Sequence, residues 1–179
     1  MKSRSKILIA LLFLVAIIAV LFFIYSRYYL NSNTRFYNEY YPEYEVVSRA
    51  VDGDTFELSN GEKVRLVCVN TPEKGEFYYK EATTFLSNLV VGKNVTLIRD
   101  VSNRDKYKRL LRYAYLNGLN GTLINLELVT QGYARSFRYP PDVRECDIIE
   151  SAERIAKEKR LGIWGERQLY SQDNINLYN

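Results

Sequence analysis

An uninterrupted apolar run near the N-terminus constrains this chain most, because it sets one stretch apart from everything that follows. Every residue from Ile7 to Ile24 is Ile, Leu, Ala, Phe or Val. At about 1.5 Å per residue, a helix of this length measures ~27 Å, close to the ~30 Å hydrocarbon thickness of a bilayer. The run therefore predicts a transmembrane anchor over residues 7–25 that contacts the lipid bilayer.

Charges on the two sides of the run predict its orientation. Lys2, Arg4 and Lys6 precede it, whereas only Arg27 and Arg35 follow nearby. The positive-inside rule then places the N-terminal residues 1–6 in the cytoplasm and the remainder outside it. A cleaved signal peptide is the alternative and would give a secreted protein. An uncleaved anchor in the cell membrane is favoured, because the run exceeds a usual signal-peptide core and no clear small-x-small cleavage site follows.

The rest of the chain divides into a linker, one domain and a tail. Residues 26–43 are polar and rich in tyrosine without a clear period, as is typical of a linker. Residues 44–166 carry the strand and helix patterns of a single domain. Residues 167–179 are too polar to fold alone and are expected to form a flexible tail.

Apolar periodicity and turn residues predict five strands and three helices in that domain. The expected strands are Tyr44–Ala50, Thr55–Leu58, Lys63–Val69, Asn94–Asp100 and Leu110–Leu116, with a hairpin turn at residues 59–61. The expected helices are Tyr79–Val90, Leu123–Gln131 and a last one capped by Asp142, with an apolar face of Ile148, Ile149, Ala152, Ile155 and Ala156. The fold class is α+β, mainly a β-barrel. A five-stranded OB-type barrel with three helices fits this pattern, although the strand count alone does not select it.

The absence of histidine narrows the chemistry that the domain can perform. None of the 179 residues is histidine, which excludes imidazole bases, Ser-His-Asp triads and His-ligated zinc. Acid–base work must use carboxylates, lysine, tyrosine or water. The net charge of +4 is compatible with an anionic partner such as nucleic acid, but it is also common in proteins that bind none.

Polar residues interrupt two strand-like stretches in a way that suits a site. "VDGDT" (residues 51–55) places two aspartates around a glycine, and "VRLVCVNTPE" (residues 64–73) ends an apolar strand in polar groups. Each also has a simpler interpretation. Asp-Gly-Asp favours a turn, Arg65 in a half-buried strand would usually pair with a structural carboxylate, and Glu73 after a proline is typical of a surface. The residues in isolation leave these alternatives open.

Three further motifs follow in order: "DKYKRLLRYAYL" (residues 105–116), "INLELVTQGYA" (residues 124–134) and "AKEKRLGIW" (residues 156–164). Over residues 44–164 the five motifs together resemble the staphylococcal nuclease (thermonuclease) family, although each motif alone is weak. The resemblance implies an OB barrel and a calcium-dependent nuclease that cleaves DNA and RNA, leaving 5′-hydroxyl and 3′-phosphate ends. We expect it to act as a monomer.

The resemblance also implies a set of metal ligands. Asp54 and Asn70 would bind one calcium ion directly, Thr71 would add its carbonyl, and Asp52 would lie in the outer shell. Calcium prefers such oxygen donors. Asn70 stands where the family commonly has aspartate, so it removes one negative charge, and we expect weaker calcium binding and room for other divalent ions.

A second implied set handles the phosphodiester. Glu73 would be the general base, Arg65 and Arg109 would clamp the phosphate, and Tyr107 would lie beside the nucleotide. Arginine suits this role because its planar donors bind phosphate in pairs. Lys108 replaces the usual glycine, so it either displaces Arg109 or contributes a cation to substrate binding. The nucleotide-contacting tyrosine of the family has no clear counterpart among Phe137, Arg138 and Tyr139.

Cys68 and Cys146 are the only two cysteines. In the family fold the strand that bears Cys68 approaches the start of the last helix, so the resemblance implies a disulfide between them, provided that the domain lies outside the cytoplasm. Free cysteines are the alternative if the domain faces the cytoplasm.

These observations favour a membrane-anchored, extracytoplasmic nuclease over two other classes of protein. An OB module that binds nucleic acid or a protein without catalysis is the alternative, and Asn70 and Lys108 support it because they weaken the expected site. A structural cell-surface protein would explain the anchor but not the ordered motifs.

Overall fold

The computed structural model describes residues 15–27 and 42–165, which belong to two separate units, Met1–Tyr41 and Pro42–Asn179. In the first unit, residues 15–27 form a helix. Within the described ranges, no helix is long and apolar enough to cross a membrane. The expected anchor over residues 7–25 begins before the described part. The expected cytoplasmic segment 1–6, most of the linker 26–43 and the tail 167–179 lie outside the described residues.

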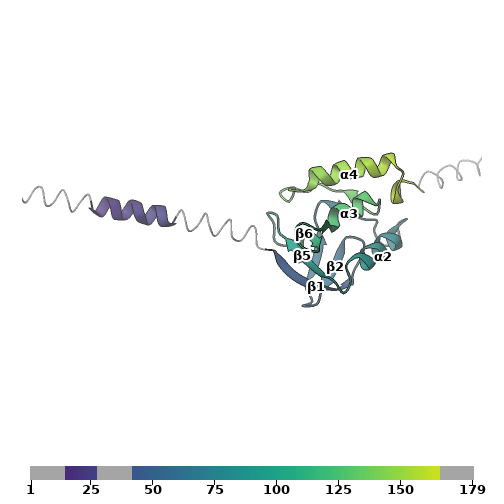
Figure 1. Cartoon of the computed structure of the whole chain (residues 1–179), viewed down its shortest axis with the longest axis horizontal. Coiled ribbons are helices and arrows are strands. Elements are labelled where there is room, and N and C mark those ends of the chain that lie inside the picture. The colour runs from purple at the N-terminus through teal and green to yellow at the C-terminus, as the bar shows by residue number, and fades with distance from the viewer. Residues whose placement is uncertain (1–14, 28–41, 166–179) are drawn as a thin grey trace, which may run out of the picture. The chain divides into compact units, whose positions relative to one another are not determined.

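Five strands of the second unit close into a barrel (Figure 1). In sequence order they are β1 (Glu43–Ala50), β2 (Thr55–Leu58), β3 (Lys63–Leu66), β5 (Asn94–Ile98) and β6 (Leu110–Leu116). Antiparallel pairs connect them in the order β3-β2-β1-β5-β6, and a parallel pair between β3 and β6 closes the ring. The short β7 (Thr122–Leu123) adds to the edge of β6. The predicted five-stranded barrel is therefore confirmed.

The β2–β3 hairpin shows how local sequence positions a polar side chain. Its turn includes Gly61 at φ 85°, a left-handed conformation that suits glycine. The hairpin register pairs Thr55 with Arg65. Side chains alternate along a strand, so Val64 and Leu66 enter the core while Arg65 lies on the other face, only partly buried.

Three α-helices cover the barrel: α2 (Tyr79–Val90), α3 (Ile124–Thr130) and α4 (Cys146–Glu158). In Figure 1, α4 lies above α3 on one side of the barrel, while α2 lies at another side. A short 3-10 helix, η1 (Gly162–Trp164), follows α4. Helix α2 has the predicted bounds and buries Ala82, Leu86 and Val90, a four-residue spacing that places them on one face.

The expected strand Lys63–Val69 is wrong in its second half. Strand β3 ends at Leu66, and the chain then turns through Cys68, whose φ of 60° is incompatible with a continuous strand. The polypeptide resumes as β4 (Val69–Asn70), which pairs with β8 (Arg135–Ser136) in a separate two-stranded sheet. Neither short strand was predicted, because each depends on the other for its hydrogen bonds.

The start and the apolar face of α4 also differ from expectation. Asp142 does not cap the helix, whose N-cap residue is Glu145. Instead, one carboxylate oxygen of Asp142 accepts hydrogen bonds from the backbone N–H groups of Val101 (3.0 Å) and Ser102 (2.7 Å). Ile148 and Ile155 were placed on the buried face, but each is 47% exposed. The buried stripe is narrower than predicted, because α4 packs mainly on α3 and β8, and its fully buried members are Cys146, Ile149 and Ala156.

Candidate active site

The "VDGDT" segment forms a tight turn between β1 and β2. The backbone N–H groups of Val51 and Asp52 both donate to the carbonyl oxygen of Thr55, and the N–H of Asp54 donates to Asp52 Oδ1 at 3.0 Å. A Cβ atom at Gly53 would come within 2.8 Å of the side chains of Thr71 and Ala82, so only glycine permits this approach. The turn interpretation is correct, and the turn also directs Asp54 inward.

Asp54 is the centre of a hydrogen-bonded cluster. The residue is only 5% exposed. Its Oδ1 accepts from the hydroxyl of Thr55 (3.1 Å) and pairs with Arg65 Nε (3.0 Å). Its Oδ2 accepts from the backbone N–H (3.1 Å) and the hydroxyl (3.2 Å) of Thr71. Burial raises the pKa of the Asp54 carboxyl above its ordinary value, although Arg65 opposes the rise, and nearby Asp52 adds to it.

Arg65 connects Asp54 to the next candidate ligand. In addition to its ion pair with Asp54, it donates from Nη2 to Asn70 Oδ1 at 3.1 Å, and from Nη1 to the carbonyl of Leu66. Its side chain is 15% exposed. The alternative that Arg65 pairs with a structural carboxylate is therefore also correct. The same guanidinium links the oxygen-bearing side chains of Asp54 and Asn70 and keeps them close together.

The "DKYKR" segment brings a second guanidinium to the cluster. Asp105 accepts the backbone N–H groups of Tyr107 (2.9 Å) and Arg109 (3.0 Å) and the Nε–H of Arg109 (2.7 Å). Burial by itself would raise the pKa of Asp105, but the bonds from Arg109 and Tyr107 outweigh it and hold that pKa below its ordinary value. Arg109 Nη1 then lies 3.4 Å from the hydroxyl of Thr55, the neighbour of Asp54. Sequence reasoning missed Asp105, whose four-residue spacing from Arg109 was the available signal.

Lys108 adopts the backbone conformation that glycine would provide. Its φ is 66°, and its N–H donates to the carbonyl of Asp105 at 3.0 Å. The turn therefore closes with lysine in place, and Arg109 keeps its bonds to Asp105. Tyr107 is 67% exposed, with Lys106 Nζ 5.0 Å and Arg109 Cζ 5.4 Å from its ring centroid. Displacement of Arg109, one of the two alternatives for Lys108, is not observed at this turn.

Two hollows open beside the cluster. The first hollow, of about 520 Å³, is lined by residues that include Arg65, Val69, Tyr107, Arg109, Phe137 and Tyr139. The second hollow, of about 450 Å³, is lined by Asn70, Thr71, Pro72, Glu73, Glu76, Phe77, Arg135 and Ile163. Glu73 therefore lies on the Asn70 side of the cluster rather than on the Arg109 side. Its backbone N–H donates to Glu76 Oε2 at 2.8 Å.

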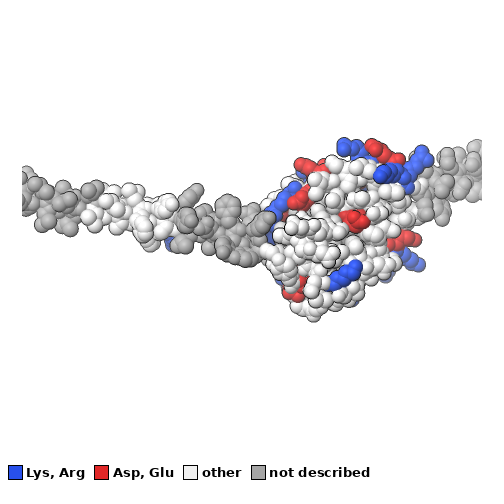
Figure 2. Space-filling view, in the orientation of Figure 1, with Lys and Arg blue, Asp and Glu red and all other residues white. Residues whose placement is uncertain are grey.

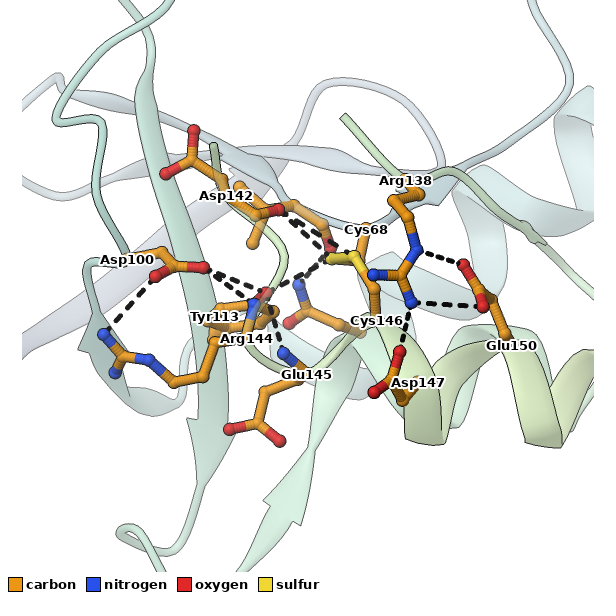
Figure 3. The surroundings of a disulfide bond; sticks show 12 residues. Cys68, Asp100, Tyr113, Arg138, Asp142, Arg144, Glu145, Cys146, Asp147 and Glu150 are labelled. Carbon is orange, nitrogen blue, oxygen red and sulfur yellow. Dashed lines mark hydrogen bonds and ion pairs between the residues drawn. A yellow bond between two sulfur atoms is a disulfide. The ribbon is translucent and has the colours of Figure 1, made fainter. Parts of the chain in front are cut away.

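Phe137 and Tyr139 line the first hollow, whereas Arg138 does not. Both are exposed, and their rings lie nearly parallel at 9° with centroids 6.2 Å apart, at the border of the first hollow. Arg138 points elsewhere and pairs with Asp147 and with Glu150 (2.7 Å) of α4 (Figure 3). These carboxylates raise the pKa of Arg138 above its ordinary value. The two aromatic residues, and not Arg138, therefore face the first hollow.

A disulfide anchors the loop between Arg65 and Asn70. Cys68 and Cys146 are joined with a Cα–Cα distance of 5.3 Å, next to Tyr113, Asp142 and the start of α4 (Figure 3). Two hydrogen bonds also hold the backbone at Cys68. Asn125 Nδ2 donates to the carbonyl of Val67 at 2.8 Å, and the backbone N–H of Phe137 donates to the carbonyl of Cys68 at 2.9 Å. Asn125 was not singled out from the sequence, because an asparagine in a helical pattern gives no signal of a distant partner.

The donor set is chemically suitable for a hard cation. Asp54 and Asn70 carry side-chain oxygens in one hydrogen-bonded cluster, which Thr71 joins through its backbone N–H, and Asp52 accepts the backbone N–H of Asp54. In the described part of the chain, no group of three or more Asp, Glu, Cys or His side chains forms a metal site. A cation here would therefore depend on amide and carbonyl oxygens as well as on carboxylate.

One face of the second unit carries charges of both signs (Figure 2). On the face of the second unit seen in Figure 2, Lys and Arg side chains are interspersed with Asp and Glu side chains, and no patch of one sign dominates. This face therefore offers no broad basic surface to a polyanion.

The sequence of this chain is similar to those of known proteins. The chain matches the family model described as "Staphylococcal nuclease homologue" over residues 63–166. It is 33% identical over 172 residues to a thermonuclease of Staphylococcus intermedius, covering 89% of this chain and 98% of that protein. A thermonuclease of Staphylococcus hyicus is 31% identical over 130 residues, covering 68% and 75%. Endonuclease YncB of Bacillus subtilis is 34% identical over 142 residues, covering 73% of this chain and 66% of that protein.

Proposed function

We propose, from the premise that this chain belongs to the staphylococcal nuclease family and is a nuclease, that it is a calcium-dependent endonuclease of DNA and RNA. The products would carry 5′-hydroxyl and 3′-phosphate ends. The observation that carries the proposal is that Asp54, Arg65 and Asn70, from three separate segments, lie in contact. Arg65 Nε is 3.0 Å from Asp54 Oδ1, and Arg65 Nη2 is 3.1 Å from Asn70 Oδ1. Arg109 reaches the edge of the same cluster through Thr55.

Three residues would hold the metal ion. Asp54 contributes carboxylate, Asn70 contributes an amide oxygen, and Thr71 contributes its carbonyl, with Asp52 supporting the turn that presents Asp54. A bound calcium ion would supply positive charge against the negative charge that builds on the phosphate oxygens. Because Asn70 is uncharged, binding should be weaker than with two carboxylates, and other divalent ions should compete.

The remaining residues would act on the phosphodiester itself. Arg65 and Arg109 would hold its non-bridging oxygens, since a guanidinium presents paired donors to a phosphate. Glu73 would remove the proton from the attacking water, which forms the new P–O bond while the bond to the 5′ oxygen breaks and that oxygen takes up a proton from solvent water. Tyr107 and Lys108, at the exposed turn before Arg109, would contact the nucleotide.

We also propose that the nuclease domain is held outside the cytoplasm by an anchor over residues 7–25. The uninterrupted apolar run and the basic residues before it support this orientation. The Cys68–Cys146 disulfide supports it independently, because disulfides persist in oxidising compartments. An epitope tag placed after Asn179 should be removed by protease added to intact cells, and a protected tag would contradict the proposal.

Cleavage of labelled single-stranded DNA by the full chain in detergent tests the activity. We expect cleavage to require a divalent ion, to stop with chelator and to fall by about 100-fold or more in Glu73→Gln, because a general base typically contributes 10²–10⁴-fold. Asn70→Asp should lower the calcium concentration needed for half-maximal rate. Lys63→Ala is the matched control on an exposed position of β3.

Three results would contradict the proposal. Cleavage that persists in chelator would remove the metal from the mechanism, and cleavage that persists in Glu73→Gln would remove Glu73 from it. If the folded protein binds DNA but neither wild type nor Asn70→Asp cuts it, a non-catalytic nucleic-acid-binding module, the alternative that Asn70 supports, becomes the better description.

A further inference from the structure

The two hollows meet at the short β4–β8 sheet. Val69 of β4 and Phe137, just after β8, line the first hollow, whereas Asn70 of β4 and Arg135 of β8 line the second. Asn70 and Arg135 are direct partners in this sheet. The hydrogen bond between Arg65, in the first hollow, and Asn70, in the second, therefore lies at the boundary between the hollows.

The second hollow contains two groups that the proposed mechanism does not use. Phe77 is 42% exposed at this hollow, and its ring centroid lies 5.3 Å from that of Tyr78. Arg135 is exposed and forms no ion pair with any carboxylate among residues 15–27 and 42–165. Its guanidinium lies 5.3 Å from the ring centroid of Trp164, so the side chain is held beside the hollow rather than free in solvent.

We propose that the second hollow binds the nucleotide on one side of the scissile phosphate, while Tyr107 contacts the nucleotide on the other side. Phe77 stacks on the base of that nucleotide, and Arg135 binds the next phosphate along the strand. The inference rests on the proposed function and extends it, because it assigns the second half of the substrate path.

The chemistry of an endonuclease requires such a subsite. Cleavage inside a strand leaves a nucleotide on each side of the phosphate, and only one of them can occupy the first hollow with Tyr107, Phe137 and Tyr139. The second hollow begins at Asn70, Thr71 and Glu73, where the scissile phosphate would lie. An aromatic ring and an unpaired arginine are the groups that proteins use to bind single strands without base preference.

The acidic residues of the second hollow determine which part of the nucleotide enters it. Glu73 and Glu76 would repel a second phosphate placed deep in the hollow. A neutral base next to Phe77 avoids this repulsion, and the following phosphate then lies at the exposed Arg135. The subsite thus accepts a base in the hollow and a phosphate at its border, which requires a strand rather than a mononucleotide.

Modified oligonucleotides test the assignment with the full chain in detergent. The substrate carries one ordinary phosphodiester among nuclease-resistant phosphorothioates. In one series the base on either side of the cleavable bond is removed, and in another the next phosphate on either side is replaced by a neutral methylphosphonate. Wild-type protein should lose kcat/KM with each change.

The variants should lose sensitivity on one side only. Phe77→Ala should lower kcat/KM for the unmodified strand about tenfold, as expected for one stacked base. It should also become insensitive to base removal on one side while staying sensitive on the other, and Phe77→Tyr should restore the wild-type pattern. Arg135→Ala should lose sensitivity to the methylphosphonate on the same side as Phe77→Ala. Its slope of log(kcat/KM) against log salt should become shallower by about 0.7.

Matched controls separate this effect from general changes of surface or charge. Tyr44→Ala removes an exposed aromatic residue of β1, and Arg154→Ala removes one exposed positive charge of α4, and neither residue lines a hollow. Both should keep wild-type sensitivity on both sides. Tyr107→Ala should show the opposite pattern and lose sensitivity on the side that Phe77→Ala retains.

The outcomes distinguish failure of the inference from failure of the proposed function. If wild-type protein cleaves the strand but Phe77→Ala and Arg135→Ala stay sensitive on both sides, the subsite is refuted and the nuclease mechanism stands. If wild-type protein does not cleave at all, both proposals fail together.

Discussion

Replacing both cysteines by alanine should cost this domain a large part of its stability. The disulfide joins residues 78 positions apart, and the loop-closure relation for a loop of that length gives about 15 cal/mol/K, or about 4.5 kcal/mol at 25 °C. Domains of this size are stable by only about 5–15 kcal/mol, so Cys68→Ala/Cys146→Ala should lose between about a third and nine-tenths of the free energy of unfolding.

Urea unfolding followed by circular dichroism measures this loss. At an m-value of about 2 kcal/mol/M the midpoint should fall by about 2 M, and thermal unfolding should shift by about 15 °C. Wild-type protein that is unfolded in the presence of a reductant should match the double variant, because both lack the same covalent constraint.

The double variant supplies its own control, since a reductant should not change it further. A loss below about 1 kcal/mol would refute the chain-entropy reasoning and show that the loop is held by other contacts. The bonds from Asn125 and Phe137 to the carbonyls of Val67 and Cys68 are the contacts that would then be responsible.

Two further predictions concern the site. Burial raises the pKa of the Asp54 carboxyl in the folded protein. The protonated carboxyl therefore stabilises the fold at low pH. This stabilisation is lost as the pH rises from the ordinary pKa of about 4 through the raised pKa. Stability of wild type minus that of Asp54→Asn, measured by urea unfolding in chelator, should therefore decrease over this interval; a difference that is constant or increases would contradict the raised pKa. Lys108→Gly should raise the free energy of unfolding by about 1 kcal/mol, because lysine at φ 66° is strained and glycine is not; equal or lower stability in thermal unfolding would show that the turn carries no strain.

Much of the secondary structure was predictable because it depends on near neighbours. Helix α2 and strands β2 and β6 have the predicted bounds, since apolar periodicity and turn residues act within a few positions. The candidate site residues were placed by the order of their motifs along the chain. Their chemical types, oxygen donors and two arginines in a chain without histidine, already restricted what the site can do.

Contacts between distant segments were decided only by the tertiary structure. The β4–β8 pair, the role of Asp142 at the backbone of Val101 and Ser102, and the exposure of Ile148 and Ile155 all depend on what packs nearby. A sequence records which side chains a segment carries, but pairing and burial are properties of two surfaces at once.

The same distinction holds at the site itself. The sequence by itself determined which residues can bind a phosphate and a cation, because that is a property of each side chain. Only the fold decided that Arg65 joins Asp54 to Asn70, and that Phe77 and Arg135 share a hollow with Glu73. These residues come from segments that meet only when the barrel closes, so their distances follow from packing of the whole domain.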